Sequence, residues 1–368
     1  MGQILEIGNL NTSDKKVELI ANKVQKGERL SFEDGVDLFS TNDIHSLGLL
    51  ADYKKRKVSG DKVYFVLNRH VNPTNICVLS CNFCDFAKKK GDSDAYEMSI
   101  EEILNSIDEE MHEVHIVGGH HPTWKFEYYE EMIKSIHDKY PDIQIKGFTA
   151  AEIDYFHRRW KIDPEESIAR LKEAGLSSMP GGGAEVFSSR VHKMLLPGKS
   201  TSSRWQEIHS IAHSQGIKSN CTMLYGHIET IEERVDHFIQ LRELQDETNG
   251  FLAFIPLQYQ TGTTQLTENP ATPIDDLKMI SIARLMLDNI DHIKSYWVTI
   301  GEETASIGLN FGADDLDGTI KKENIMHAAK AKSPGGLARE KMIYLIKEAR
   351  KVPVERNALY SEIKVYED

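Results

Sequence analysis

The chain has 368 residues, of which 40% are hydrophobic and 27% charged, and its formal net charge is −13. This negative charge and the lack of a long basic tract argue against nucleic acid as a partner. Its 4 cysteines are too few for a disulfide-rich secreted scaffold. The sequence has no signal-peptide pattern and no apolar stretch of about 18 residues that could cross a membrane. We therefore expect a globular protein of the reducing cytoplasm without a membrane partner.

The N-terminal part of the chain is predicted to be helical. Amphipathic runs at Val17–Val24 and Phe32–Phe39 are followed by a third run at Ile44–Tyr53, which begins after good capping residues. No linker, low-complexity tract or internal repeat divides the rest of the chain. We expect an N-terminal helical segment over residues 1–60. Residues 61–368 should form a barrel with a C-terminal helical extension, so that the chain is one structural domain overall.

From residue 62 onward, short β-rich runs alternate with longer amphipathic stretches, which predicts a parallel sheet with crossover helices. About eight such units favour an α/β fold of the (β/α) TIM-type barrel, complete or partly open. The candidate strands are Val63–Leu67, Val114–Val117, Ile143–Phe148, Leu176–Ser178, Lys218–Met223, Phe251–Pro256, Ser295–Ile300 and Ser306–Phe311. The candidate helices are Ile100–Glu109, Glu127–Lys139, Pro164–Ala174, Ser202–Ser214, Ile231–Leu244 and Ile274–Leu287, with a last helix at Lys341–Lys351 before a polar tail.

Polar residues and glycines follow the predicted strands, at the end where (β/α) barrels carry their active sites. The second strand is followed by the run GGHHP, and the fourth by a triple glycine and Glu185. The fifth strand leads to Tyr225 and His227. This ring of polar residues predicts a functional site at one face of the barrel. An acidic trio further on, Asp314, Asp315 and Asp317, is predicted to be a solvated loop, with the barrel mouth as the alternative place.

Three cysteines, Cys77, Cys81 and Cys84, lie within the eight-residue run CVLSCNFC. A cubane iron–sulfur cluster normally takes four cysteine ligands, so three would leave one iron open to a small molecule. The alternatives are three structural thiols or a zinc site, which would need a fourth ligand such as His70. Cys221 lies in an apolar strand pattern and is predicted to be a packed core thiol.

The cysteine spacing, with Phe83 before the last cysteine, resembles the signature of radical S-adenosylmethionine (SAM) enzymes. The surrounding string NPTNICVLSCNFCDF resembles the branch that acts on futalosine-type menaquinone precursors and deazaflavin precursors. The strings GGHHP, FTAAEI and MPGGGAEVFSSRVHKMLLPGK are most similar to the aminodeoxyfutalosine synthase family. The resemblance runs from about residue 25 to the C-terminus.

This resemblance implies a [4Fe–4S] cluster on the three cysteines, with SAM bound to the open iron. Reduction of the cluster would release a 5′-deoxyadenosyl radical. In the aminodeoxyfutalosine synthase family, this radical adds to the enol ether of 3-[(1-carboxyvinyl)oxy]benzoate, and rearrangement with decarboxylation follows, in menaquinone biosynthesis. The resemblance thus implies a radical SAM transferase that forms a carbon–carbon bond and consumes SAM as a co-substrate.

The resemblance also implies roles for individual residues. The SAM-binding candidates are Phe83, Gly118, Gly119, Ser178, Glu185 and Arg190. The catalytic candidates are His120, His121, His227 and Tyr225. Simpler roles compete with these: a turn for the glycines, a helix-end carboxylate for Glu185, strand capping for the histidines and a solvated surface position for Arg190. The candidate cations for the substrate carboxylates are Arg69, His70, Arg190, Lys199 and His227.

The expected substrate is a small dicarboxylate aryl enol ether, and the expected reductant is a flavodoxin- or ferredoxin-type electron donor. The sequence leaves room for a homodimer. Two alternative functions stay open. One is the dehypoxanthine futalosine cyclase of the same pathway, in which the adenosyl radical abstracts hydrogen. The other is a non-catalytic iron–sulfur carrier or sensor, which would leave SAM intact.

Overall fold

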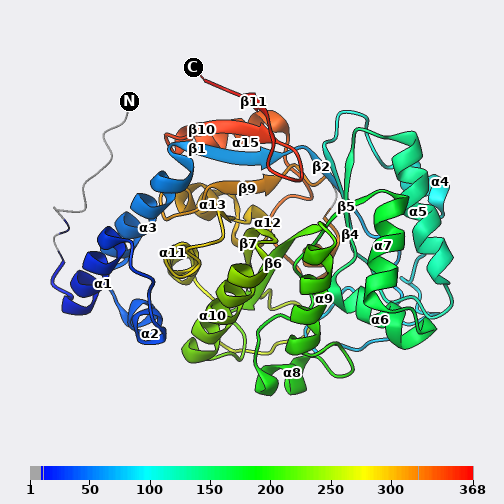
Figure 1. Cartoon of the computed structure of the whole chain (residues 1–368), viewed down its shortest axis with the longest axis horizontal. Helices are drawn as coiled ribbons and strands as arrows, with labels where there is room; N and C mark the ends of the chain where they lie inside the picture. The colour runs from blue at the N-terminus through cyan, green and yellow to red at the C-terminus, as the bar shows by residue number, and fades with distance from the viewer. Residues whose placement is uncertain (1–9, 11, 322, 368) are drawn as a thin grey trace.

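Three helices precede the first strand of the computed structural model, which describes residue 10 and residues 12–321 and 323–367. They are α1 (Lys15–Lys26), α2 (Phe32–Ser40) and α3 (Ile44–Ser59), and they lie together at one side of the molecule (Figure 1). Ser31 and Asp34 form a capping box that begins α2. Helix α3 packs along α11 (Pro273–Met286). The three helices lie where the sequence predicts them.

Seven parallel strands form the larger sheet, in the spatial order in which they follow along the chain. They are β2 (Asn68–Val71), β3 (Glu113–Ile116), β4 (Gln144–Gly147), β5 (Leu176–Met179), β6 (Lys218–Tyr225), β7 (Phe251–Gln258) and β8 (His292–Ile293). A second sheet has the order β11 (Glu362–Val365), β10 (Val352–Arg356), β1 (Lys62–Val66) and β9 (Asp315–Gly318). In this second sheet, β10 and β11 are antiparallel, whereas β1 pairs in parallel with β10 and with β9.

The two sheets join into a barrel at both edges of the larger sheet. Strand β1 runs into β2 across the single residue Leu67. Strand β9 pairs with β1 in parallel, and an isolated bridge between Lys294 and Asp315 links it to the segment that follows β8. The backbone N–H of His70 donates to the carbonyl oxygen of Ile320 at 3.0 Å. The predicted (β/α) barrel is therefore confirmed, and short hydrogen-bonded contacts at β9 bring its edges together.

Helices surround the strands on the outside of the barrel (Figure 1). The longer ones are α5 (Phe126–Lys139), α6 (Ala150–Trp160), α7 (Pro164–Ala174), α9 (Ser202–Ser214), α10 (Ile231–Thr248) and α15 (Arg339–Glu348). The shorter ones are α4 (Ile100–Asn105), α8 (Ser189–Leu195), α12 (Trp297–Ile300), α13 (Glu302–Gly308) and α14 (Ile325–Ala328). Among the described residues, no helix combines the length and the apolar character that a membrane span requires.

Two predicted strands and the predicted tail were wrong. Residues 295–300 contain the short helix α12, and residues 306–311 contain the end of α13, because Gly301 at φ 83° turns the chain into a new helix between them. The strand that completes the barrel is instead β9, whose sequence DLDG has no apolar alternation. The segment after α15, predicted to be a polar tail, forms β10 and β11. Strand β10 is buried beside β1.

The acidic trio at β9 is buried, not solvated. Asp314 pairs with Arg284 of α11 at 2.8 Å, and Asp317 pairs with Lys294 at 2.7 Å. Asp315 pairs with Arg356 of β10, also at 2.7 Å. These carboxylates are all buried, and each cation comes from a different part of the chain. The prediction of a solvated loop is therefore wrong, because three buried cations compensate the three charges.

We expect Asp314→Asn to lower the free energy of unfolding by about 3–5 kcal/mol, because it leaves the buried Arg284 without a compensating charge. Burial alone would raise the pKa of Asp314, but Arg284 and His292 hold it well below its usual value of 3.8. The loss should therefore be full above pH 3.8 and should shrink as the pH falls further, because the wild-type carboxylate then takes up a proton.

Urea unfolding of the two proteins at several pH values measures this difference. Asp138→Asn is the matched control, since it breaks the exposed Lys134–Asp138 pair on α5 and should have little effect. Equal stability of Asp314→Asn and wild type at neutral pH would contradict the expectation.

Candidate functional site

A cavity of about 260 Å³ opens at the C-terminal ends of the barrel strands. It extends from the cysteine loop, residues 72–99 between β2 and α4, to side chains that point inward from the strands. Of the predicted site residues, it is lined by Cys77, Cys81, Cys84, Phe83, Gly118, Gly119, His120 and Glu185. The barrel therefore brings together residues that are up to about a hundred positions apart in the chain.

Hydrogen bonds to neighbouring segments hold the cysteine loop, which has little regular secondary structure. The N–H of Cys77 donates to the carbonyl oxygen of Lys88 at 2.9 Å, and the N–H of Val78 donates to that of His120 at 3.0 Å. The ammonium group of Lys89 donates to the carbonyl oxygens of Cys77 and Leu79, at 3.0 and 2.8 Å. The loop is thus tied both to itself and to the end of β3.

The environment of the cysteines suits metal binding more than free thiolates. Burial raises the pKa of Cys81 to about 11 and also raises the pKa of Cys84. These thiols would stay protonated at neutral pH unless a metal displaced the proton. In the described part of the chain, no three His, Cys, Asp or Glu side chains are arranged to hold a single metal ion. A cluster that offers a separate iron to each cysteine fits this arrangement better than one zinc ion does.

Gly119 lets the end of β3 pack directly on the cysteine loop. A Cβ atom at this position would lie 2.2 Å from the carbonyl oxygen of Ile76. The N–H of Gly119 donates to the carbonyl oxygen of Thr74 at 2.8 Å, and the N–H of His120 points to the sulfur of Cys77 at 3.4 Å. The segment after β3 therefore positions Cys77, because only glycine at position 119 allows the two backbones to lie this close.

Glu185 and Lys199 form a buried ion pair in the cavity wall, 3.0 Å apart. The Lys199 ammonium also lies 5.5 Å from the centre of the Phe83 ring. Burial alone would lower the pKa of Lys199, but Glu185 and the thiols of Cys81 and Cys84 raise it. Lys199 is therefore a fixed positive charge between the carboxylate and the cysteine loop.

His120 and Glu152 are two buried titratable groups in the same wall. Burial lowers the pKa of His120 to about 3, and its Nδ1 has no hydrogen-bond partner among the described residues. Burial raises the pKa of Glu152 to about 7, against the hydrogen bonds from the N–H and hydroxyl of Thr149. Sequence reasoning placed Glu152 at a strand end but gave it no role. His120 is neutral at pH 7, and Glu152 is close to its midpoint.

Five predicted site residues do not line this cavity, and four of them have other partners. His121 is fully buried beside Trp124, and its Nε2 lies 2.8 Å from Glu97. The hydroxyl of Tyr225 donates to Asp276 at 2.7 Å. Arg190 is half exposed and binds Glu233 at 2.6 Å.

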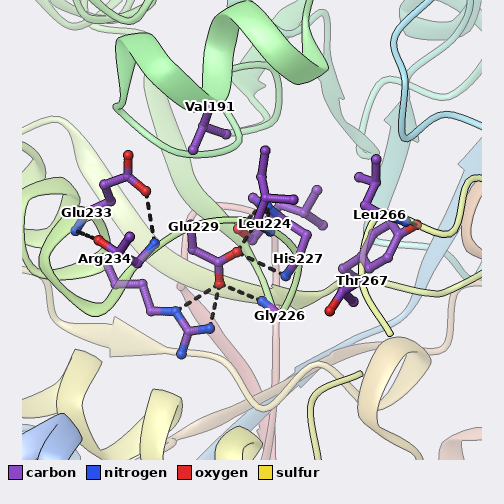
Figure 2. Close-up of polar contacts among 12 residues, drawn as sticks. Val191, Leu224, Gly226, His227, Glu229, Glu233, Arg234, Leu266 and Thr267 are labelled. Atoms are coloured by element: carbon purple, nitrogen blue, oxygen red, sulfur yellow. Dashed lines mark hydrogen bonds and ion pairs between the residues drawn. The ribbon is translucent and has the colours of Figure 1, made fainter. Parts of the chain in front are cut away.

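The fourth is His227, which belongs to a separate buried cluster behind the strand ends. Figure 2 shows Glu229 between Gly226, His227 and Arg234. The carboxylate of Glu229 accepts from the N–H groups of Gly226 and His227, and Arg234 donates to it as well. This cluster orders the turn after β6. The position of His227 just after a strand was therefore a poor guide to its surroundings.

Ser178 lies inside β5 and is buried, and its hydroxyl has no hydrogen-bond partner among the described residues. It does not line the cavity that those residues form. The cavity also contains side chains that sequence reasoning missed: His115, Asn220, Tyr296, Glu323 and Met326. His115 could have been found, because it precedes the inward-facing Val117 by two residues in a predicted strand.

Comparison with known proteins gives two family matches. The model for the radical SAM superfamily matches residues 71–241, and the model for the CofH/MqnC C-terminal region matches residues 248–368. The chain is 42% identical to an aminodeoxyfutalosine synthase from Thermus thermophilus, over 96% of this chain and 98% of that protein. The chain belongs to the radical SAM superfamily. It is also 40% identical to an aminodeoxyfutalosine synthase from Streptomyces coelicolor, over 95% of this chain and 94% of that protein.

Solved structures support the fold. The crystal structure of methylornithine synthase aligns with a TM-score of 0.73 and 18% identity, and covers 91% of this chain and 97% of that chain. The hydrogenase maturase HydG from Carboxydothermus hydrogenoformans aligns with a TM-score of 0.72 and 17% identity, and covers 94% and 81%. As a radical SAM protein, the chain is an enzyme that uses SAM and an iron–sulfur cluster.

We expect Gly119→Ala to incorporate several-fold less iron than wild type, because the new methyl group would collide with the Ile76 carbonyl oxygen and displace the cysteine loop. Iron and sulfide content after anaerobic reconstitution measures this. Gly182→Ala is the matched control, since the nearest atom to its Cβ would be Thr149 Cγ2 at 3.6 Å, an ordinary contact. Wild-type iron content in Gly119→Ala would show that the loop does not need this approach.

Proposed function

We propose that this protein is an aminodeoxyfutalosine synthase, which joins the adenosyl group of SAM to 3-[(1-carboxyvinyl)oxy]benzoate in menaquinone biosynthesis. The observation that carries the proposal is the 42% identity to the Thermus enzyme over almost the whole of both chains. The similarity thus spans the cysteine loop, the barrel and the C-terminal region, which contributes Asp317, Glu323 and Met326 to the cavity. A superfamily member that resembled this chain only at the cluster site would not be expected to match it in the C-terminal region.

In this proposal, Cys77, Cys81 and Cys84 hold a [4Fe–4S] cluster. Their number leaves one iron for the amino and carboxylate groups of SAM. The loop is kept rigid by Lys89 and by its contact with Gly119, so the cluster would sit at the mouth of the barrel. When it is bound and reduced, the cluster supplies the electron that cleaves SAM into methionine and the adenosyl radical.

The remaining wall residues would orient SAM. Gly118, Gly119 and Gly181–Gly183 line the cavity, and their main-chain groups would contact SAM. Glu185 would accept hydrogen bonds from the ribose hydroxyls, with Lys199 compensating its charge at 3.0 Å. Phe83 would pack against the ligand. His120, neutral and with a free Nδ1, would hydrogen-bond to the substrate. His121, His227, Tyr225 and Arg190 have no role in this proposal.

The overall reaction balances in atoms and electrons. One electron cleaves SAM, and the adenosyl radical adds to the vinyl methylene carbon of the substrate. Methionine and carbon dioxide would leave, the electron would pass back to the cluster, and no proton would be gained or lost overall. The chain's own contribution is to hold the two reactants in contact and to exclude water, for which apolar wall residues such as Ile255, Leu257 and Met326 are suited.

The proposal also includes partners outside the active site. A flavodoxin- or ferredoxin-type protein would donate the electron, in the reducing cytoplasm that an oxygen-sensitive cluster requires. Assembly as a homodimer is compatible with this function.

A related candidate is the cyclisation catalysed later in the same pathway. The chain is 36% identical to a cyclic dehypoxanthine futalosine synthase from Streptomyces coelicolor, over 97% of this chain and 91% of that protein. That identity is lower than the identity to either synthase above. The two functions differ in the fate of the adenosyl group, which stays in the product of the synthase and is released as 5′-deoxyadenosine by the cyclase.

We expect anaerobic incubation with dithionite, SAM and 3-[(1-carboxyvinyl)oxy]benzoate to yield aminodeoxyfutalosine, because the adenosyl radical is captured by the enol ether. Mass spectrometry detects this product. Cys84→Ala should abolish the product, whereas Cys221→Ala should retain it, since Cys221 is a buried thiol in β6 outside the cluster loop. Formation of 5′-deoxyadenosine alone, from dehypoxanthine futalosine, would favour the cyclase. Intact SAM with both substrates would favour a non-catalytic carrier.

A further inference from the structure

Two histidines lie side by side at the deep end of the cavity. The register of β2 and β3 pairs His70 with His115, and both residues line the cavity. His70 Nε2 and His115 Nδ1 are 3.3 Å apart, and the ring centres are 4.6 Å apart. The outer ring nitrogen of His115, Nε2, is buried and has no hydrogen-bond partner among the described residues. The pair therefore has free hydrogen-bonding capacity in a buried place.

The depth of the pair distinguishes it from the SAM end of the cavity. Gly118 comes three positions after His115, just beyond the end of β3, and three positions correspond to about 10 Å along an extended chain. The cavity wall also contains Val117, Ile255 and Tyr296. Such apolar and aromatic surfaces suit an aromatic ring. A ligand that reaches from the cysteine loop to the histidines would therefore place an arene between them.

The charges that face the histidine pair already have partners. Lys146 of β4 pairs with Glu113 of β3 at 2.8 Å, and Asp317 of β9 pairs with Lys294 at 2.7 Å. The carboxylate of Glu323 accepts from backbone N–H groups at 325–327 and lies 3.0 Å from His327. A carboxylate that entered this region would find no uncompensated cation. A neutral histidine that took up a proton would provide one.

Other candidate cations are engaged or lie elsewhere. Arg69 donates to the carbonyl oxygen of Lys321 and does not line the cavity that the described residues form. Arg190 binds Glu233, and His227 lies beside Glu229. Lys199 is paired with Glu185 near the cysteines. The basic residues left at the deep end are therefore His70 and His115.

We propose that the His70–His115 pair is the binding site for an aryl carboxylate and that it takes up one proton when this carboxylate binds. The inference rests on the proposed function, in which the enol ether must lie near SAM, so that the benzoate group is the deeper end of the substrate. Burial lowers the pKa of both histidines. The pair is therefore neutral in the free enzyme, and the bound anion shifts it to the charged form, in which an imidazolium donates to the carboxylate.

Calorimetry on the reconstituted enzyme tests the proton uptake without any variant. Binding of 3-[(1-carboxyvinyl)oxy]benzoate is measured at pH 7.5 in buffers of different ionisation enthalpy. We expect uptake of about one proton per bound molecule. The analogue that lacks the ring carboxylate, 2-phenoxyacrylate, should bind about 10- to 100-fold more weakly and without this uptake. Equal affinity for the two compounds, or no proton uptake by the substrate, would overturn the proposal.

Variants of His70 and His115 test whether these two residues bind the carboxylate and take up the proton. His115→Gln and His70→Asn keep polar side chains but cannot gain a proton, so each should weaken substrate binding about 10- to 100-fold, remove proton uptake and leave analogue binding unchanged. His213→Gln is the matched control, since this histidine bonds to Thr248 and Ser219 away from the cavity. Melting temperatures report on folding. Loss of binding for both compounds would indicate a structural role and overturn the proposal.

The inference and the proposed function can fail separately. If aminodeoxyfutalosine forms but His115→Gln binds substrate as wild type does, the function stands and the carboxylate site is wrong. If no aminodeoxyfutalosine forms but 3-hydroxybenzoate still binds with proton uptake that His115→Gln abolishes, the carboxylate site stands and the reaction is wrong.

Discussion

Buried ion pairs hold strand β9, which completes the barrel, and the rest of the structure depends on these pairs. Strand β9 carries Asp315 and Asp317 and follows Asp314 directly, and all three are buried. Without cations, three buried carboxylates so close together would be prohibitively unfavourable. Arg284, Lys294 and Arg356 supply these cations from α11, the segment after β8, and β10. The C-terminal part of the chain is thereby fastened to the barrel, and the deep end of the cavity is closed.

The two ends of the cavity have different electrostatic characters, and this difference suits two ligands. Near the mouth, Lys199 is a fixed cation beside Glu185 and the cysteine thiols, whose protons are retained by burial until iron displaces them. At the deep end, the charges of Lys146 and Asp317 are matched by their partners and the histidines are neutral. One end is thus permanently charged, whereas the other can change its charge when a ligand arrives.

Much of the fold could be predicted from the sequence, because most strands and helices follow the apolar periodicity on which prediction relies. The cysteine spacing was equally informative, since its chemistry depends on local sequence alone. Strand β9 could not be found in this way: its sequence DLDG has no apolar pattern, and its burial depends on cations more than twenty residues away. Residues 295–300 and 306–311, which contain α12 and the end of α13, were predicted to be strands because periodicity alone does not distinguish a short apolar strand from a short helix.

Some residues of the candidate site could likewise be predicted from the sequence, and others could not. The places of Gly119 and Glu185 in the cavity wall could be predicted, because both follow barrel strands and lie at the face where such folds carry their sites. Tyr225, His121 and His227 also lie at or just after strands. Their side chains do not line the cavity, because they bind Asp276, Glu97 and Glu229, respectively. Such partners cannot be seen without the tertiary structure.

The C-terminal region contributes residues to the cavity wall, and these residues bear on how the site could select its substrate. In the proposed function, the cysteine loop and glycine-rich strand ends serve SAM, which the members of the superfamily share, so these parts would not distinguish one substrate from another. Asp317 of β9 also lines the cavity, as do Glu323 and Met326 from the segment between β9 and α15. Their placement depends on the buried ion pairs of β9. The interaction that closes the barrel therefore also shapes the part of the site that must recognise the substrate, so reaction specificity and fold closure are coupled through the same strand.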